Sequence, residues 1–108
     1  MYIPDKGDIV SLSFDPSAGN EIIKRRLALI ISRKAFNEHT GFSIVAPITS
    51  TKRGIALEVE LEETNTQGVV LIHQLRSLDV NSRGIQFVEK APAAVTERAT
   101  KLAVTIIS

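Results

Sequence analysis

Residues 9–31 read IVSLSFDPSAGNEIIKRRLALII, two apolar runs separated by a polar, turn-forming segment. The first run, Ile9–Phe14, alternates apolar and polar residues, which is typical of a half-buried strand. The second run, Leu27–Ile31, is continuously apolar, which is typical of a strand buried on both faces. The dipeptide Asp15-Pro16 favours a turn. The stretch predicts two strands joined by a loop that carries one acid, Glu21, and ends in three cations, Lys24, Arg25 and Arg26.

Four further segments have strand patterns. In Phe42–Ser50, Pro47 predicts an edge strand or a bulge, because proline cannot donate to a ladder of hydrogen bonds. In Ala56–Glu62, apolar residues alternate with glutamates, so a solvated acidic face is predicted there, formed by Glu58, Glu60 and Glu62. The other two segments are Val69–Ile72, which continues less regularly to Val80, and Ile85–Val88.

The pattern becomes helical after Pro92. Apolar residues then recur at helical spacing, at Val95, Ala99, Leu102 and Ile106. Lys34–Asn37 is long enough for a single helical turn only. Three phenylalanines are expected in the core: Phe36, Phe42 and Phe87. The patterns together predict a mainly β fold, a small twisted sheet or open barrel with one C-terminal helix packed on it.

Composition narrows the function classes. The 108 residues suit one domain, residues 1–108. Without cysteine, and with only two histidines, the chain offers neither a thiolate metal site nor a histidine-rich cluster, so no metal or cofactor is expected. No apolar run approaches the ~20 residues that span a bilayer, and the N-terminus has no secretory apolar region, so a cytoplasmic location is expected. The net charge is only +1, but basic and acidic residues lie in separate stretches of the sequence. A protein with charges separated in this way can bind a polyanion on its basic face.

The side chains that remain for chemistry suit a phosphodiester. There is no Gly-rich phosphate loop, nucleophile elbow or His-Glu-x-x-His pattern. Fixed cationic donors can stabilise the transition state at phosphorus. RNA brings its own nucleophile, the 2′-hydroxyl, so neither a metal nor a protein nucleophile is required. The candidates are Glu21, Lys24, Arg25, Arg26, Thr49, Ser50, Lys52, Arg53 and His73.

Over nearly its full length the chain resembles the MazF/PemK (Kid) toxins of bacterial toxin–antitoxin systems. Phe14-Asp15-Pro16-Ser17-Ala18-Gly19-Asn20-Glu21 resembles the family's F-D-P-x-x-G-x-E. Further matches follow in family order and spacing, at Ala35–Asn37, Val45–Ser50, Gly68–Leu71, Gln74–Asp79 and Arg83-Gly84. The sequence departs from the family's usual loop at Ile22, Lys24 and Leu27, and the PemK acid–base set has no counterpart at Asn20 and Leu71.

The resemblance implies an SH3-like open barrel of the CcdB/PemK type and a homodimer that a cognate antitoxin inhibits with an acidic tail. It implies a metal-independent endoribonuclease, an mRNA interferase, that cuts single-stranded RNA at selected sequences and inhibits translation. The family's catalytic arginine, threonine and loop glutamate correspond to Arg26, Thr49 and Glu21. His73 is a candidate for proton transfer. Lys24, Arg25, Lys52 and Arg53 are candidate phosphate contacts, and Asn20 and Ser50 are candidate base contacts.

Two other interpretations stay open at this point. CcdB-type toxins resemble this fold but poison gyrase by protein–protein contact. The chain can also be a decayed toxin that binds only antitoxin or RNA, a reading that the altered loop keeps open. The run Lys24–Arg26 together with Thr49 favours RNA over gyrase.

Overall fold

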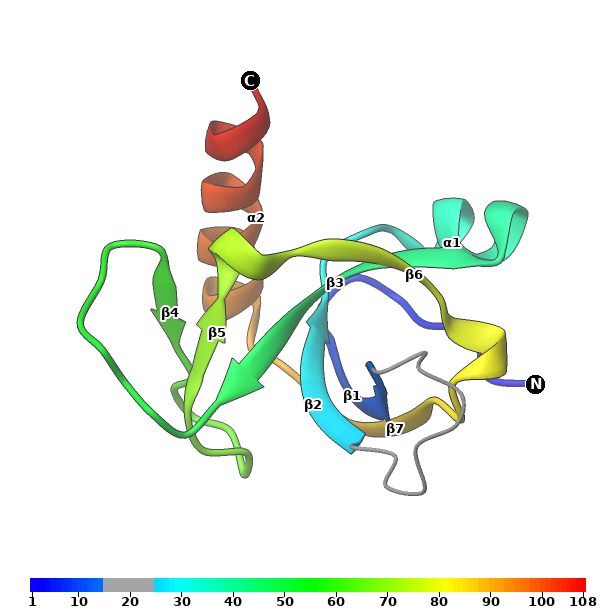
Figure 1. Cartoon of the computed structure of the whole chain (residues 1–108), viewed down its shortest axis with the longest axis horizontal. Coiled ribbons are helices and arrows are strands. Elements are labelled where there is room, and N and C mark those ends of the chain that lie inside the picture. The colour runs from blue at the N-terminus through cyan, green and yellow to red at the C-terminus, as the bar shows by residue number, and fades with distance from the viewer. Residues whose placement is uncertain (15–24) are drawn as a thin grey trace.

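The computed structural model describes residues 1–14 and 25–108. In these residues the chain forms seven strands, two α-helices and two 3₁₀ turns (Figure 1). The strands are β1 (Asp8–Ser13), β2 (Arg25–Ile30), β3 (Phe42–Thr49), β4 (Glu58–Glu60), β5 (Val69–Leu71), β6 (Arg76–Asp79) and β7 (Gln86–Lys90). The helices are α1 (Lys34–Thr40) and α2 (Ala93–Ile107), and the 3₁₀ turns are η1 (Ile72–Gln74) and η2 (Val80–Ser82).

The strands form one twisted, open antiparallel sheet with α2 against it, as the sequence predicted. The strand order is β4-β5-β3-β2-β1-β7, and β6 pairs separately with β3. β3 is therefore the central strand. It pairs with β2 along one edge, and along the other edge it pairs first with β6 and then with β5.

Pro47 lies in this central strand, so the prediction of an edge strand is wrong. On the β2 side Pro47 is opposite Ala28. On the other side β3 pairs with β6 up to Val45 and with β5 from Ile48 onward. The missing N–H of proline thus falls where β3 changes partner, which is why the sheet tolerates it.

The two faces of β2 fill two separate apolar clusters. Leu29 packs with Ala46, Ile48 and Val95 on the face covered by α2, and Ala28 and Ile30 pack with Val45 on the other face. Ala28, Leu29 and Ile30 have no exposed surface. The prediction of a strand buried on both faces is confirmed.

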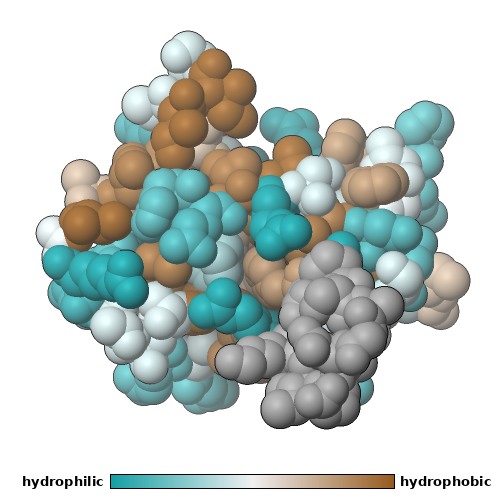
Figure 2. All heavy atoms as spheres, viewed as in Figure 1, coloured by the Kyte–Doolittle hydropathy of each residue, from teal (hydrophilic) through white to brown (hydrophobic). Residues whose placement is uncertain are grey.

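Helix α2 follows the predicted pattern in its first part. Val95, Ala99 and Ala103 are buried against the sheet. Ile106 is exposed instead, because the C-terminal end of α2 projects beyond the sheet, where Figure 2 shows hydrophobic side chains on the surface. No helix in the described residues combines the length and apolar character needed to cross a membrane.

Three smaller predictions are corrected. Helix α1 continues to Thr40, past the single turn predicted at Lys34–Asn37, because Gly41 supplies the left-handed residue that ends it. Only residues 58–60 of the predicted strand Ala56–Glu62 pair in the sheet. The phenylalanines expected in the core are all exposed by more than two-fifths, since they lie on α1 and on poorly covered strand faces: Phe36, Phe42 and Phe87.

Candidate functional site

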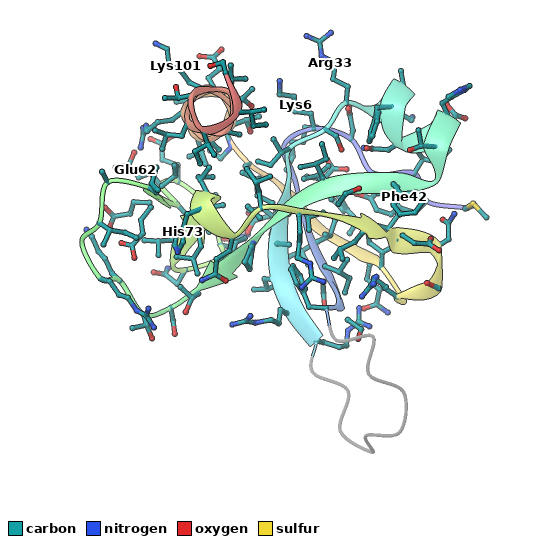
Figure 3. All side chains as sticks on the ribbon, turned by 45° about the horizontal axis from the view of Figure 1, so that its top comes forward. Lys6, Arg33, Phe42, Glu62, His73 and Lys101 are labelled. Carbon is teal, nitrogen blue, oxygen red and sulfur yellow. The ribbon has the colours of Figure 1, made fainter. Side chains whose placement is uncertain are left out.

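A hollow of about 100 Å³ lies where β2 begins and where β3 and β5 end. Four residues singled out from the sequence line it: Arg26, Thr49, Arg53 and His73. Figure 3 shows His73 on this side of the molecule, on the turn η1 that follows β5. Four lining residues were not predicted as site residues: Ile55, Glu58, Leu71 and Gln74.

Strand pairing brings the distant parts of this site together. Ala28 of β2 is opposite Pro47 of β3, and continuing this antiparallel register by two residues places Arg26 opposite Thr49. Side chains two apart share a face, so the pairs Thr49–Val69 and Leu71–Glu58 extend the same face across β5 to β4. Toward the centre this face is filled by Ala28 and Val45, and toward the strand ends it opens as the hollow.

A backbone N–H two residues further along the chain orients the hydroxyl of Thr49. Its oxygen accepts a hydrogen bond of 3.2 Å from the N–H of Thr51. A hydroxyl has one proton to donate besides the lone pairs that accept, so that proton is available to an oxygen bound in the hollow. Thr49 is partly exposed, at the last position of β3.

The loop after β3 is held by Glu58. One carboxylate oxygen of Glu58 accepts from the N–H of Gly54 at 3.0 Å, and the other accepts from the N–H of Arg53 at 3.0 Å. This loop brings Arg53 to the hollow. Glu58 keeps part of the exposure predicted for the solvated face, and in addition its carboxylate binds this loop. The alternation of residues 56–62 contains no signal that separates Glu58 from Glu60 and Glu62.

The remaining predicted contacts are spread more widely. Lys52 pairs with Glu60 at 3.1 Å, with both side chains more than half exposed, and Ser50 is exposed beside Thr49. Arg25 points away from the hollow, since it neighbours Arg26 on a strand and forms hydrogen bonds with Ser11 and Gly84. Asn20, Glu21 and Lys24 lie outside the described residues.

The charges of the hollow favour an anion. Among the residues that the structure describes, two guanidinium groups, from Arg26 and Arg53, line it together with His73, and one carboxylate, of Glu58, is hydrogen-bonded to backbone N–H groups. Guanidinium donors fit the oxygens of a phosphate in pairs. In residues 1–14 and 25–108 no group of three His, Cys, Asp or Glu side chains is placed to hold a metal ion.

Fold and site together define a class, small antiparallel-sheet proteins with a terminal helix and a basic hollow at the open end of the sheet. The sequence model of one family, described as "PemK-like, MazF-like toxin of type II toxin-antitoxin system", matches residues 5–106. The chain belongs to this family of PemK/MazF toxins.

Individual relatives agree with the family match. The "Endoribonuclease toxin ChpB" of Escherichia coli K12 is 37% identical over 101 residues, covering 88% of this chain and 86% of that protein. The "Endoribonuclease toxin MazF" of the same strain is 35% identical over 83 residues, covering 77% and 75%. A crystal structure of MazE-MazF (Form-II) from Deinococcus radiodurans superposes with a TM-score of 0.90 at 38% identity, covering 99% of this chain and 97% of that chain.

Proposed function

We propose that this chain is the toxin of a type II toxin–antitoxin system and acts as an endoribonuclease that cuts single-stranded mRNA and thereby inhibits translation. The observation that carries the proposal is that Arg26 and Thr49, distant in sequence, line the same hollow. The names of the ChpB and MazF relatives support the activity.

The reaction is a transesterification within the RNA. The 2′-hydroxyl oxygen attacks the adjacent phosphorus and loses its proton, and the bond from phosphorus to the 5′-oxygen of the next nucleotide breaks. That oxygen takes up a proton. The products are a 2′,3′-cyclic phosphate and a 5′-hydroxyl end, and the RNA supplies the nucleophile without a metal.

Each residue of the hollow has a role in this scheme. Arg26 donates two hydrogen bonds to the non-bridging oxygens, which gain negative charge in the transition state. Thr49 donates its hydroxyl proton to the same phosphate, and Arg53 adds a second cation. His73, whose side chain is exposed at the edge of the hollow, transfers a proton to or from the reacting oxygens.

Residues outside the hollow extend the contact with RNA. Lys24 and Lys52 contact flanking phosphates, and Asn20 and Ser50 contact unstacked bases. Glu21 acts as a general base or as an acceptor for RNA. An mRNA substrate implies a cytoplasmic location.

The proposal includes two protein partners. A cognate antitoxin covers the basic hollow with an acidic tail, and the MazE-MazF complexes among the similar structures support such a partner. A second copy of the chain covers the projecting apolar end of α2, where Val104, Ile106 and Ile107 are exposed. Sedimentation of the purified protein tests the homodimer, and a monomer at micromolar concentration contradicts it.

The central experiment is cleavage of a long RNA by purified protein in EDTA, with mapping of the new 5′ ends. We expect cuts at a recurring short sequence, each with a 5′-hydroxyl. Arg26→Ala should slow them by about 10²–10³, whereas Lys101→Ala, which removes one exposed cation from α2, should leave their rate unchanged. Intact RNA contradicts the proposal. Trapped gyrase–DNA complexes would then identify a gyrase poison, and tight antitoxin binding alone would identify a decayed toxin.

A further inference from the structure

The guanidinium of Arg25 links β2 to β1 and to the turn before β7. Its Nε donates to the hydroxyl of Ser11 at 3.1 Å, and its Nη2 donates to the carbonyl of Ser11 at 2.8 Å. The same Nη2 donates to the carbonyl of Gly84 at 2.6 Å, 59 residues away in sequence. Arg25 is on β2, Ser11 is on β1, and Gly84 precedes β7. The Nε and Nη2 donors of Arg25 are therefore engaged by β1 and by the turn before β7.

A second guanidinium fixes the other side of the β1–β2 connection. Nη1 of Arg83 donates to the carbonyls of Ser13 and Phe14 at 3.2 and 3.1 Å. The N–H of Ser13 in turn donates to the carbonyl of Arg83 at 3.0 Å. The Phe14 ring lies 5.9 Å from the guanidinium carbon of Arg76. The turn Arg83-Gly84 thus contacts the end of β1, through Ser13 and Phe14, and the start of β2, through Arg25.

Gly84 fits this arrangement because it has no side chain. Its φ is +62°, in the left-handed region, and a Cβ at this position would be 3.0 Å from Nη1 of Arg25. A side chain here would press on the end of the Arg25 guanidinium, which would have to shift by a few tenths of an ångström.

We infer that Arg25 is a positioning residue for Arg26, held with the turn Arg83-Gly84, and not the phosphate contact expected from its place in the run of cations. Neighbouring residues of a strand point to opposite faces, so anchoring Arg25 on one face fixes the direction of Arg26 on the other. Arg26 is thereby aimed at Thr49 across the β2–β3 pair. This inference rests on the proposed ribonuclease function for its kinetic test.

Arg25→Gln distinguishes positioning from phosphate contact. A lost phosphate contact raises KM and lowers the slope of log affinity against log salt by about 0.7 on a single strand. A misplaced Arg26 lowers kcat and leaves that slope unchanged. We expect kcat to fall about 10- to 100-fold, because misplacements near 1 Å have effects of this size. A raised KM and a reduced slope at wild-type kcat would overturn the inference.

Gly84→Ala tests the same arrangement without a change of charge. We expect a loss of kcat in the same direction as for Arg25→Gln, again with an unchanged salt slope. Gly41→Ala is the matched control, because Gly41 also has a positive φ, +77°, but its Cβ would meet no atom closer than 3.5 Å. That control should show a comparable loss of thermal stability with wild-type kcat. Equal kinetics of the two glycine variants would argue against positioning.

Two measurements keep the inference testable apart from catalysis. If the wild-type protein does not cleave RNA, the proposed function fails, and binding of an uncleavable RNA with 2′-O-methyl groups still yields the salt slope for Arg25→Gln. Amide hydrogen exchange should show faster exchange at Arg26 in Arg25→Gln and Gly84→Ala and unchanged exchange in Gly41→Ala. Wild-type exchange at Arg26 in the first two variants would overturn the positioning role.

Discussion

Gly68 packs against the backbone of Thr49, so closely that a Cβ on Gly68 would lie 2.4 Å from the Thr49 carbonyl oxygen. Gly68 has a φ of +131° and precedes β5, the strand that pairs with the end of β3. The proposed catalytic threonine therefore depends on a residue without a side chain immediately before the neighbouring strand.

Gly68→Ala should strongly destabilise the protein. The substitution strains a positive φ and also forces a backbone oxygen to move, and we expect a loss of about 3 kcal/mol or more in the free energy of unfolding. Gly54→Ala should lose only about 1 kcal/mol, because its φ is also positive but no atom lies within 4 Å of the added Cβ. Denaturant unfolding of both variants measures the difference, and equal losses would show that the contact with Thr49 is not tight.

Arg26→Ala should lower the rate of RNA cleavage by about 10²–10³, the usual effect of removing one transition-state donor. Arg26→Lys should recover only part of the rate, because an ammonium keeps the charge but cannot form the paired hydrogen bonds of a guanidinium. Single-turnover cleavage at saturating protein measures this step. A fully active lysine variant would mean that Arg26 supplies charge alone.

Thr49→Val should lower the same rate with little loss of stability, since Thr49 is at a strand end and valine keeps its shape. The only hydrogen bond of the Thr49 hydroxyl within the described residues is the one it accepts from Thr51. An unchanged rate in the valine variant would remove this hydroxyl from the mechanism.

The sequence predicts the sheet better than it predicts the site. Alternation in Ile9–Phe14 and the unbroken apolar run after Arg26 are direct consequences of which faces are buried, so both strands were found. The point where β3 changes its partner from β6 to β5 has no signal in the local sequence, so the sequence cannot show that a central strand tolerates Pro47 there. Residue chemistry makes Arg26 and Thr49 candidates, but only the family resemblance pairs them in one site, since no spacing in the sequence shows that they are opposite each other. The contact of Glu58 with the loop has no sequence signal, because its hydrogen-bond partners are backbone N–H groups, which every residue except proline provides.

Glu58→Gln should loosen the loop that carries Arg53. A neutral amide oxygen accepts more weakly than a carboxylate, and only one amide oxygen remains for two backbone N–H groups. We expect faster amide exchange at Arg53 and Gly54 and a cleavage rate lowered about tenfold by misplacement of Arg53. Glu60→Gln is the matched control, because Glu60 is on the same strand and, within the described residues, its carboxylate pairs with the exposed side chain of Lys52 instead of backbone N–H groups. The idea fails if both variants exchange alike.

Glu89 couples the turn between β4 and β5 to the far edge of the sheet, and it should make stability depend on pH. The hydroxyl of Thr66 donates to its carboxylate at 2.6 Å, the N–H of Asn65 donates at 3.1 Å, and these bonds hold the pKa of Glu89 below its ordinary value of 4.5. A carboxylate whose pKa is lowered by folding stabilises the protein above the unfolded pKa, and that contribution is lost as the pH falls through the folded value. Between pH 6 and about pH 3 the melting temperature of the wild-type protein should therefore fall more steeply than that of Glu89→Gln. Glu97→Gln, which changes an exposed acid on α2, is the control for the general effect of removing one carboxylate. If the melting temperatures of the wild-type protein and of Glu89→Gln fall in parallel, these hydrogen bonds do not favour the ionised form.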